Sequence, residues 1–346
     1  RDGAASVART YEQGFFRDMA ALDVLPPDAI TRVSDFVPDI INFVSQLQVK
    51  GFAYKGSQSG TMWFDTTAYG PRYGALEPSR GFSCGHDHDN PSEAWEGDAE
   101  VQKMSGEKRN FRDFALWKPV MDDAEAGWDS AFGFGRPGWH VECSAFCLAM
   151  FGATPPAPFL HSGGRDLRFP HHENEIAQSQ ALLDSERWVQ HWMHAGQLTV
   201  EGKKMSKSLK NFTSIQEFLE TASARQFRIF CLLHRYSADI AFSADRMSDA
   251  AAWERTFANF FRTVAVHSEG RYAAYEATNA AGGGPLRWDE ALSELNRRFL
   301  EARRDIDALL ADDVDTAGAM RHLRKLMAAT QTAMAAPGLT ASAAWP

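Results

Sequence analysis

In the middle of the chain, short apolar segments alternate with longer stretches of helical length. This alternation restricts the possible folds more than any other feature of the sequence. The segments "FALW", "FLHSGG" and "MHAGQLTV" have the length of β-strands. The stretches between them, "WHVECSAFCLAMFG" and "PHHENEIAQSQALL", have the length of helices. Alternating strands and helices of this size are typical of an α/β layer, so we predict an α/β fold for this part of the chain.

The segments on either side predict further elements. "PDIINFVSQLQVKG" carries Ile40, Val44 and Leu47 at helical spacing, and "FAYKGSQSGTMWFD" predicts two short strands joined by a turn. The acid-rich stretch 77–108 has little periodicity and is predicted to be an inserted loop. From Ser248 onward the spacing of apolar residues is helical throughout, which predicts an all-α bundle.

Composition excludes several classes of protein. The chain has 346 residues, a net charge of −9 and 44% hydrophobic residues, as in an ordinary globular protein, and it lacks an apolar run long enough for a membrane span. The acidic balance argues against binding nucleic acid by overall charge, although a local basic patch could still do so. Four cysteines without a repeating pattern favour a reducing compartment over a disulfide framework.

The stretch "FPHHENEIAQSQALL" brings together side chains that can bind a metal. If Pro170 starts the helix, His171 and Glu175 lie four residues apart on one face, and imidazole and carboxylate are both zinc ligands. Cys143, on another helix of the same layer, would be a third ligand whose thiolate favours zinc over magnesium. Alternatively, His171 and Glu175 form a pair on the helix surface and Cys143 is a small buried side chain.

Two further motifs contain glycine or lysine in loops. "HSGGRD" follows an apolar segment, so its glycines would let the backbone approach a ligand, although an ordinary tight turn is the alternative. "KMSKS", residues 204–208, places lysines in a short polar loop that could close on a departing phosphate group. A solvated lysine loop is the alternative there.

These motifs together resemble one family. "GRPGWHVECSAF", "HSGGRDLRFPHHENEIAQSQ" and "GKKMSKSLKNF" occur in the order expected for cysteinyl-tRNA synthetase, a class I aminoacyl-tRNA synthetase, and the similarity runs through nearly the whole chain. In that family a zinc ion in the amino-acid pocket is held by two cysteines, a histidine and a glutamate, and it binds the thiolate of substrate cysteine. By motif, the resemblance implies that Cys143, His171 and Glu175 are three of these ligands.

The remaining family ligand has no matching motif here. The resemblance places it upstream of Arg1, and Cys84 is a weaker substitute because it lies in the predicted loop. Cys147 and Cys231 are predicted to be core residues.

The resemblance also implies roles in nucleotide and amino-acid binding. Gly163 and Gly164 would pass against the adenosine of ATP, and Asp166 would bind its ribose. Lys207 would be the main catalytic phosphate contact, with Lys204 in support. Trp139 and His161 would line the amino-acid pocket.

The family's His-x-Gly-His motif does not occur in these 346 residues, and we expect both it and the anticodon-binding part to lie outside the chain. The expected architecture is a partial class I synthetase Rossmann-like catalytic domain with a connective insertion, followed by a helical bundle. The segments are the end of the first catalytic half (1–30), the connective insertion (31–135), the second catalytic half (136–195), a stem-contact region with the KMSKS loop (196–247) and the bundle (248–346).

The implied activity is that of a cysteine–tRNA ligase. It would use Zn²⁺, and Mg²⁺ with ATP, and its partners would be L-cysteine, ATP and tRNA(Cys), without a membrane. A monomer in the cytoplasm is expected, with an organellar copy left open. Two alternatives are a cysteine ligase of the mycothiol pathway, which joins cysteine to an amino sugar, and a non-catalytic RNA-binding relative.

Overall fold

The computed structural model describes residues 2–77, 106–121, 125–153, 158–200, 203–205, 211–280 and 290–335. The chain divides into two compact units. The first comprises residues 1–16 and 26–195, and the second comprises residues 17–25 and 196–346. Helix α1 (Asp2–Ala21) contributes residues to both units. Most of the predicted 77–108 loop lies outside the described residues.

An antiparallel sheet forms one part of the first unit. Its strands are β1 (Ala53–Lys55), β2 (Met62–Phe64), β3 (Phe114–Pro119) and β4 (Gly135–Pro137), in that order. The two strands predicted in "FAYKGSQSGTMWFD" are therefore confirmed, and they pair directly. Two short helical segments are nearby in sequence: η1 (Val33–Asp35) precedes the sheet, and α3 (Thr66–Tyr69) lies between β2 and β3.

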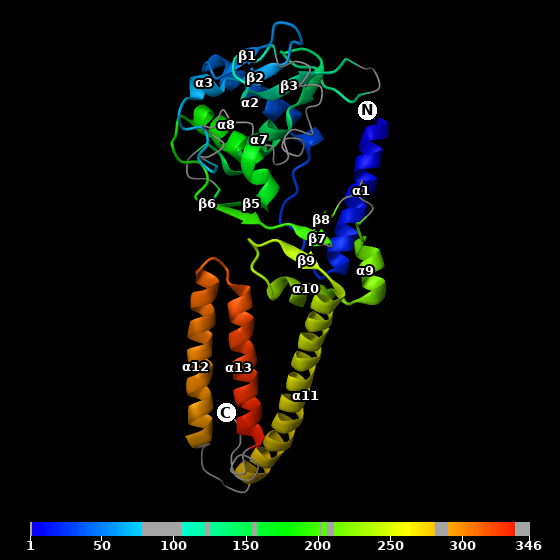
Figure 1. Ribbon diagram of the computed structural model, residues 1–346, viewed down its shortest axis with the longest axis vertical. Helices are drawn as coiled ribbons and strands as arrows, with labels where there is room; N and C mark the ends of the chain where they lie inside the picture. The colour runs from blue at the N-terminus through cyan, green and yellow to red at the C-terminus, as the bar shows by residue number, and fades with distance from the viewer. Residues whose placement is uncertain are drawn as a thin grey trace. The chain divides into compact units, whose positions relative to one another are not determined.

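Three helices of the first unit pack together beside this sheet (Figure 1). They are α2 (Val37–Val49), α7 (Trp139–Phe151) and α8 (Glu173–Leu183). The predicted stripe Ile40, Val44 and Leu47 is fully buried in the core, because residues three or four apart on α2 face the same neighbours. Gly51 follows the helix with a positive φ of 84°, which only glycine adopts without strain.

A parallel strand pair carries the central motif of the first unit. β5 (Leu160–Gly164) pairs with β6 (His191–Ala195), and the connection between them contains α8. The chain leaves β5 through η3 (Arg165–Leu167) and a π-helical turn, η4 (Arg168–His172), before α8 begins. This strand–helix–strand unit confirms the predicted α/β layer.

The apolar segment "MHAGQLTV" forms two strands rather than one. Residues up to Ala195 belong to β6, whereas β7 (Leu198–Val200) lies in the second unit between β8 (Lys203–Lys204) and β9 (Ile240–Phe242). Gly196 separates the two strands and donates its N–H to the Tyr236 carbonyl at 2.8 Å. A Cβ at Gly196 would collide with the Ala238 backbone. The first strand therefore ends here, where two segments of the backbone approach closely.

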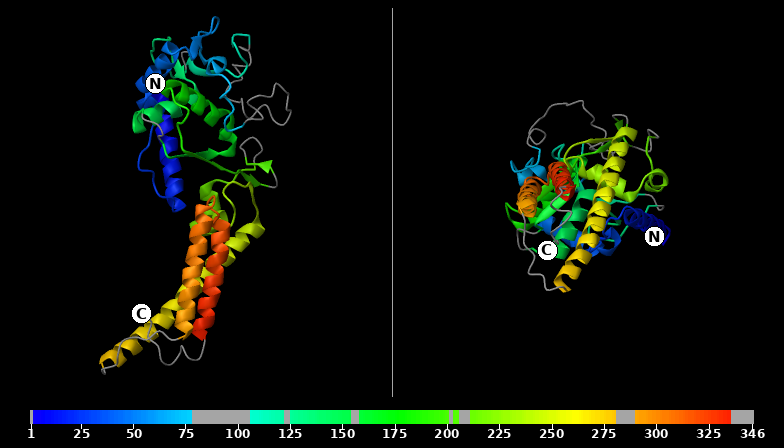
Figure 2. Two further views of the ribbon diagram at one scale, coloured as in Figure 1. Left: turned by 90° about the vertical axis from the view of Figure 1, so that its left-hand side faces the viewer. Right: turned by 90° about the horizontal axis from the view of Figure 1, so that it is seen from below.

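Helices make up the rest of the second unit. α9 (Ile215–Thr221) and α10 (Ala224–Leu232) both start with a capping box, from Ser214 and Ser223 respectively. α11 (Ala244–Ala280), α12 (Glu290–Ala311) and α13 (Thr316–Ala335) follow, and α12 and α13 lie side by side (Figures 1 and 2). The predicted all-α region after Ser248 is confirmed for its described residues, 248–280 and 290–335. Among the described helices, none combines the length and the apolar character that crossing a bilayer requires.

The prediction that Cys231 is a core residue is wrong, because its side chain is exposed on α10. The apolar run "FRIFCLLH" is not buried along its whole length. Phe230 alone takes the fully buried position of this helix, and the adjacent side chain points about 100° away.

Candidate metal and substrate site

A thiol, an imidazole and a carboxylate converge in the first unit. His171 Nε2 lies 2.8 Å from Glu175 Oε1 and 3.7 Å from Cys143 Sγ. The three ligand atoms all lie within 4.8 Å of one another. The structure therefore brings together the three residues that the sequence analysis selected as metal ligands.

The local fold explains this convergence. His171 is in η4 and Glu175 is in the first turn of α8, so their spacing of four residues directs both side chains the same way. α7 packs against α8 and supplies Cys143. His171 is 4% exposed and Glu175 is 0% exposed. The alternative of a pair on the helix surface is therefore wrong.

A second group of ligand atoms shares the same carboxylate. His161 Nε2, on β5, lies 3.1 Å from Glu175 Oε2, and His172 completes a set whose ligand atoms are within 4.8 Å of one another. His172 Nδ1 in turn lies 2.8 Å from His194 Nε2 on β6. Glu175 is thus the centre of a histidine cluster formed by β5, β6 and the start of α8.

The charge states in this cluster follow from burial and from neighbouring groups. Burial opposes ionisation of Glu175, but His161 and His171 outweigh it and lower the carboxyl pKa to about 2. Burial lowers the pKa of His172 to about 4 and that of His140 to about 3, so both imidazoles are neutral at pH 7. Burial also raises the pKa of the Cys143 thiol. A carboxylate and neutral imidazoles are the forms that bind metal ions.

The Glu175 carboxylate fits a bound cation. Both of its oxygens are buried, and neither accepts a hydrogen bond of favourable angle from the part of the chain that the structure describes. The imidazoles of His161 and His171 are close to these oxygens but are not aligned to donate to them. Buried carboxylates are rarely left without such partners, and a set of sulfur, nitrogen and oxygen donors suits zinc.

Aromatic rings surround the cluster. The Trp139 ring centroid is 4.6 Å from that of His171, and the Trp139 side chain is 58% exposed, so it lies between the buried ligands and solvent. The ring centroid of Trp192 is 4.9 Å from that of His161. Of the residues predicted to line the amino-acid pocket, His161 contacts Oε2 of Glu175, and Trp139 packs on His171, which contacts Oε1.

Some of the predicted nucleotide-binding residues lie close to this cluster. Gly163 and Gly164 end β5, and Asp166 follows in η3. A Cβ at Gly163 would lie 2.7 Å from His172 Cε1, so the absence of a side chain lets the strand pass against the imidazole. Lys204 is in β8 of the second unit, and its side chain is not described. Lys207 and Cys84 lie outside the described residues.

The sequence analysis missed four members of this cluster, namely His140, His172, Gln178 and His194. His140 places its Nδ1 2.9 Å from that of His171, and Gln178 donates to the His140 carbonyl at 2.6 Å. His194 reaches the cluster only because β6 pairs with β5. The position of His140 next to Trp139 was the one local signal that could have identified it.

Comparison with known proteins agrees with the predicted resemblance. The family described as "tRNA synthetases class I (C) catalytic domain" matches residues 2–252, which is more than half of the chain. Curated relatives include the cytoplasmic cysteine–tRNA ligases of Dictyostelium discoideum, 38% identical over 327 residues, and of Homo sapiens, 38% identical over 337 residues. These matches cover 93% and 96% of this chain but only 46% and 43% of the relatives, so the chain spans less than half of their length.

A solved structure shares the fold at low sequence identity. Mycobacterium tuberculosis methionyl-tRNA synthetase in complex with methionyl-adenylate superposes with a TM-score of 0.64 at 15% identity, over 95% of this chain and 70% of that one. The expected class I synthetase fold is thereby confirmed. The family model and the curated relatives confirm the resemblance to cysteinyl-tRNA synthetase. With the family model and the fold in agreement, this chain belongs to the family of class I tRNA synthetase (C) catalytic domains.

Proposed function

We propose that this chain carries catalytic parts of a cysteine–tRNA ligase. The reaction would activate L-cysteine with ATP to cysteinyl-adenylate and pyrophosphate, and would then transfer the cysteinyl group to tRNA(Cys). The convergence of half-buried Cys143 with buried His171 and Glu175 is the single observation that carries this proposal. It supports a soft metal site, and the curated relatives of this family are named cysteine–tRNA ligases.

The three residues would hold zinc and thereby select the amino acid. When bound, the ion would supply a Lewis-acidic position that a thiolate fills and the hydroxyl of serine does not. Glu175 contributes a carboxylate that stays ionised, and burial within the α7–α8 interface keeps competing water ligands away. Selection by a bond that serine cannot make is stronger than selection by an apolar pocket of the same size.

The other predicted residues would bind the rest of the substrates. Trp139 and His161 would border the cysteine, while Gly163, Gly164 and Asp166 would bind the adenosine. Lys204 and Lys207 would contact the phosphates, which Mg²⁺ accompanies. We retain the proposed segments 1–30, 31–135, 136–195, 196–247 and 248–346, and the division between Ala195 and Gly196 supports one of their boundaries. The proposal also includes a monomeric, cytoplasmic protein.

Metal analysis and amino-acid selectivity test this function on one sample. We expect about one zinc per chain, cysteine binding by calorimetry at least tenfold tighter than serine binding, and ATP–pyrophosphate exchange that depends on cysteine. Equal binding of the two amino acids, or a chain that binds no zinc, would contradict the selection mechanism. A zinc-loaded chain that binds cysteine but shows no exchange, even after a segment carrying the His-x-Gly-His motif is joined to it, would contradict the activation step and leave the metal site intact.

A further inference from the structure

One glutamine side chain joins the two helices that carry the proposed zinc ligands. Gln178, on α8, is fully buried, and its Nε2 donates to the His140 carbonyl at 2.6 Å and to the Ser144 hydroxyl at 2.7 Å. Both acceptors belong to α7, where they lie on either side of Cys143 in the sequence. The Gln178 amide therefore bridges α7 and α8 beside the residues that would hold the metal.

The partners of this amide determine its orientation. A backbone carbonyl can only accept, so the group that contacts the His140 oxygen must be the NH₂ of Gln178. The Ser144 hydroxyl accepts from the same group and keeps its own proton, which it directs to the Glu175 carbonyl at 3.4 Å. The contacts thus run from α8 to α7 and back to α8 at Glu175, one of the proposed ligands.

Stability alone does not explain a glutamine at this position. The Oε1 of Gln178 is buried and accepts no hydrogen bond from the residues that the structure describes. An unsatisfied buried acceptor reduces stability, and an apolar side chain of similar length would avoid that penalty. Departures of this kind from satisfied packing are expected at functional sites.

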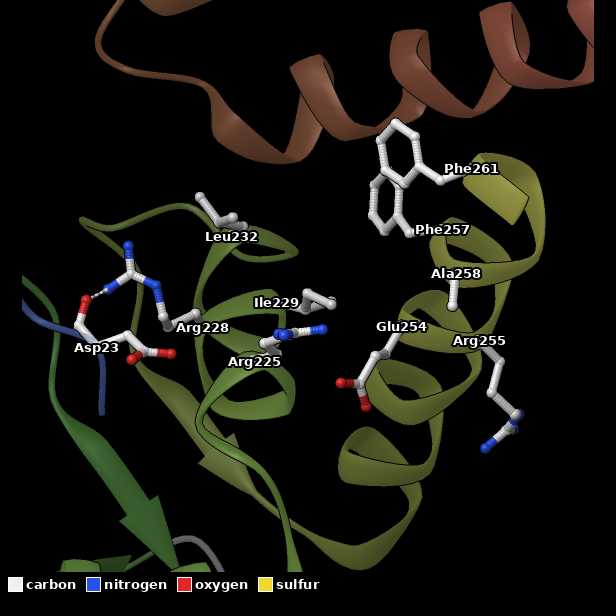
Figure 3. Close-up of a pocket in the computed structure, with 10 residues that line it drawn as sticks. All are labelled: Asp23, Arg225, Arg228, Ile229, Leu232, Glu254, Arg255, Phe257, Ala258 and Phe261. Carbon is white, nitrogen blue, oxygen red and sulfur yellow. Dashed lines mark hydrogen bonds between the residues drawn. The ribbon is translucent and has the colours of Figure 1, made fainter. Parts of the chain in front are cut away.

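A glutamine in the second unit offers a comparison. Gln226 of α10 donates to Glu254 of α11 at 2.9 Å, so it also joins two helices. Glu254 lines a cavity of about 540 Å³ whose ten lining residues all lie outside α7 and α8 (Figure 3). Loss of the Gln226 contact should therefore loosen two helices without affecting the proposed zinc ligands.

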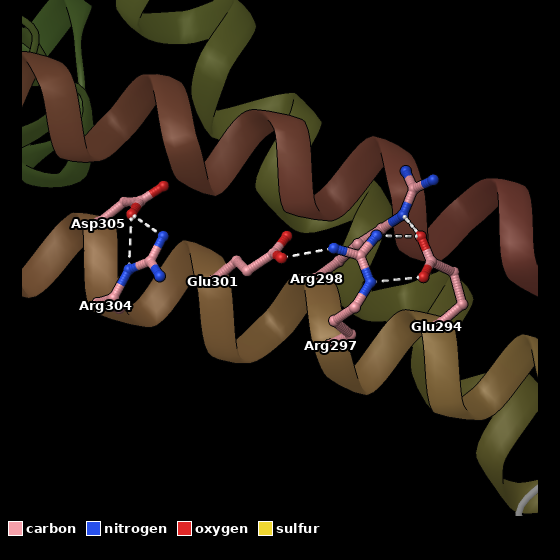
Figure 4. A network of polar contacts seen from close by, with 6 residues as sticks. All are labelled: Glu294, Arg297, Arg298, Glu301, Arg304 and Asp305. Carbon is pink, nitrogen blue, oxygen red and sulfur yellow. Dashed lines mark hydrogen bonds and ion pairs between the residues drawn. The ribbon is translucent and has the colours of Figure 1, made fainter.

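The polar contacts of α12 have a different character (Figure 4). Arg297 pairs with Glu294 and Glu301, and Arg298 pairs with Glu294 at 2.8 Å. These exposed pairs connect residues of a single helix, and solvent screens them, so they contribute little. The Gln178 contacts, by contrast, are shielded from solvent and fix one helix against another.

We propose that Gln178 is a positioning residue for the metal site. Its amide holds α7 against α8, so that Cys143 and the Glu175 carboxylate stay close enough to share one ion. Gln178 acts through the two helices and does not itself bind the metal; it reduces the cost of gathering ligands from separate elements. This inference rests on the proposed function, because the contact positions a ligand set only if the chain binds zinc.

Metal binding by the full chain tests this role. Gln178→Met retains the length of the side chain, removes the amide and should weaken binding of Zn²⁺ and Co²⁺ roughly 10- to 100-fold. The sulfur-to-cobalt absorption band, measured at saturating Co²⁺, should also weaken because Cys143 is less well placed. Gln180→Met and Gln226→Met are matched controls that should retain the wild-type affinity and spectrum. Gln180 lies on the same helix as Gln178, but its amide accepts from Tyr69.

Ser144→Ala removes part of the same network by a smaller change. It should weaken metal binding roughly two- to tenfold in the wild type, the effect of one hydrogen bond. In the Gln178→Met background the loss should be smaller, because both residues act through one shared contact. Circular dichroism establishes that each variant folds, and Ser144→Ala carries the test alone if Gln178→Met does not fold.

Unchanged metal affinity and an unchanged cobalt spectrum in Gln178→Met would overturn the inference. So would an equal loss in either control variant, since that would indicate a general loss of stability, or an effect of Ser144→Ala that is the same in both backgrounds. These outcomes would leave the proposed function intact. A wild-type chain that binds neither ion would instead refute the proposed metal site, and the positioning role with it.

Discussion

The Nδ1 atoms of His140 and His171 lie 2.9 Å apart, so one imidazole donates a hydrogen bond to the other. Burial lowers the pKa of His140 to about 3, and the neutral ring can accept from His171. With a metal bound, that arrangement would leave the Nε2 lone pair of His171, which faces Cys143 and Glu175, for the ion. His140 would therefore orient the proposed ligand His171 without itself binding the metal.

Replacement of His140 tests this role. His140→Ala should lower zinc affinity by roughly 10- to 100-fold, the usual effect of removing a partner of a metal ligand. Competition with a chromophoric chelator measures the zinc affinity. The exposed His191 supplies the control, since His191→Ala should bind zinc as tightly as the wild type does. Equal zinc affinities in the two variants would remove the assigned role.

The two cysteines of α7 should differ in their effect on metal content. Cys143→Ser removes the thiolate nearest His171 and should leave the chain with far less than one zinc after dialysis. Cys147→Ser changes a cysteine one helical turn away that belongs to neither ligand group, and it should retain the metal. Atomic absorption on both samples compares them. Full zinc content in Cys143→Ser would refute the ligand assignment.

Glu173 should be important for stability. Its buried carboxylate accepts hydrogen bonds from the backbone N–H groups of Gly74, Ala75 and Leu76, at 2.7 to 3.0 Å. Glu173→Gln replaces one acceptor oxygen by a donor and should reduce the free energy of unfolding by roughly 1–3 kcal/mol. Urea denaturation measures the change. The exposed Glu186 is the control. If Glu186→Gln lost as much stability as Glu173→Gln, the hydrogen bonds from the three backbone amides would be unimportant.

Gly163 should not tolerate a side chain. Gly163→Ala places a Cβ 2.7 Å from His172 Cε1 and should cost roughly 1–3 kcal/mol of stability through overpacking. Gly14→Ala, in α1, meets no atom within 4 Å and should be neutral or slightly stabilising. Thermal unfolding of both variants separates a specific clash from a general effect. A neutral Gly163→Ala variant would show that the strand can move away from the imidazole.

Glu107 should make stability depend on pH in the acidic range. Partial burial opposes its ionisation, but hydrogen bonds from Ser59 and from the Gln58 backbone outweigh this and lower its pKa below 4.5. Because the folded-state pKa is lowered, the stabilisation is complete above the unfolded-state pKa and disappears as pH falls through the folded-state value. Glu107→Gln should therefore be less stable than the wild type at pH 7 and equal to it near pH 2. A stability difference that persists at pH 2 would contradict this explanation.

Sequence periodicity was sufficient where the signal is local. The stripe of Ile40, Val44 and Leu47 predicted α2 correctly, since propensity and burial agree along one helix. The spacing of His171 and Glu175 likewise predicted their contact within one helical turn.

Contacts between distant segments could not be predicted in this way. His194 reaches His172 only through the parallel pairing of β5 with β6, and nothing in either segment specifies that register. The separation of β6 from β7 at Gly196 depends on a backbone 40 or more residues later in the chain. Exposure of Cys231 depends in the same way on which face of α10 its neighbours cover.

The three amides that end on Glu173 also provide a means of observing motion at the proposed metal site. Glu173 opens α8 and lies between His171 and Glu175, so these N–H groups lose their acceptor whenever the first turn of the helix unwinds. Their hydrogen–deuterium exchange consequently follows local opening at that turn. Exchange of Gly74, Ala75 and Leu76 should slow when metal is added, giving a readout of occupancy that needs neither ATP nor tRNA.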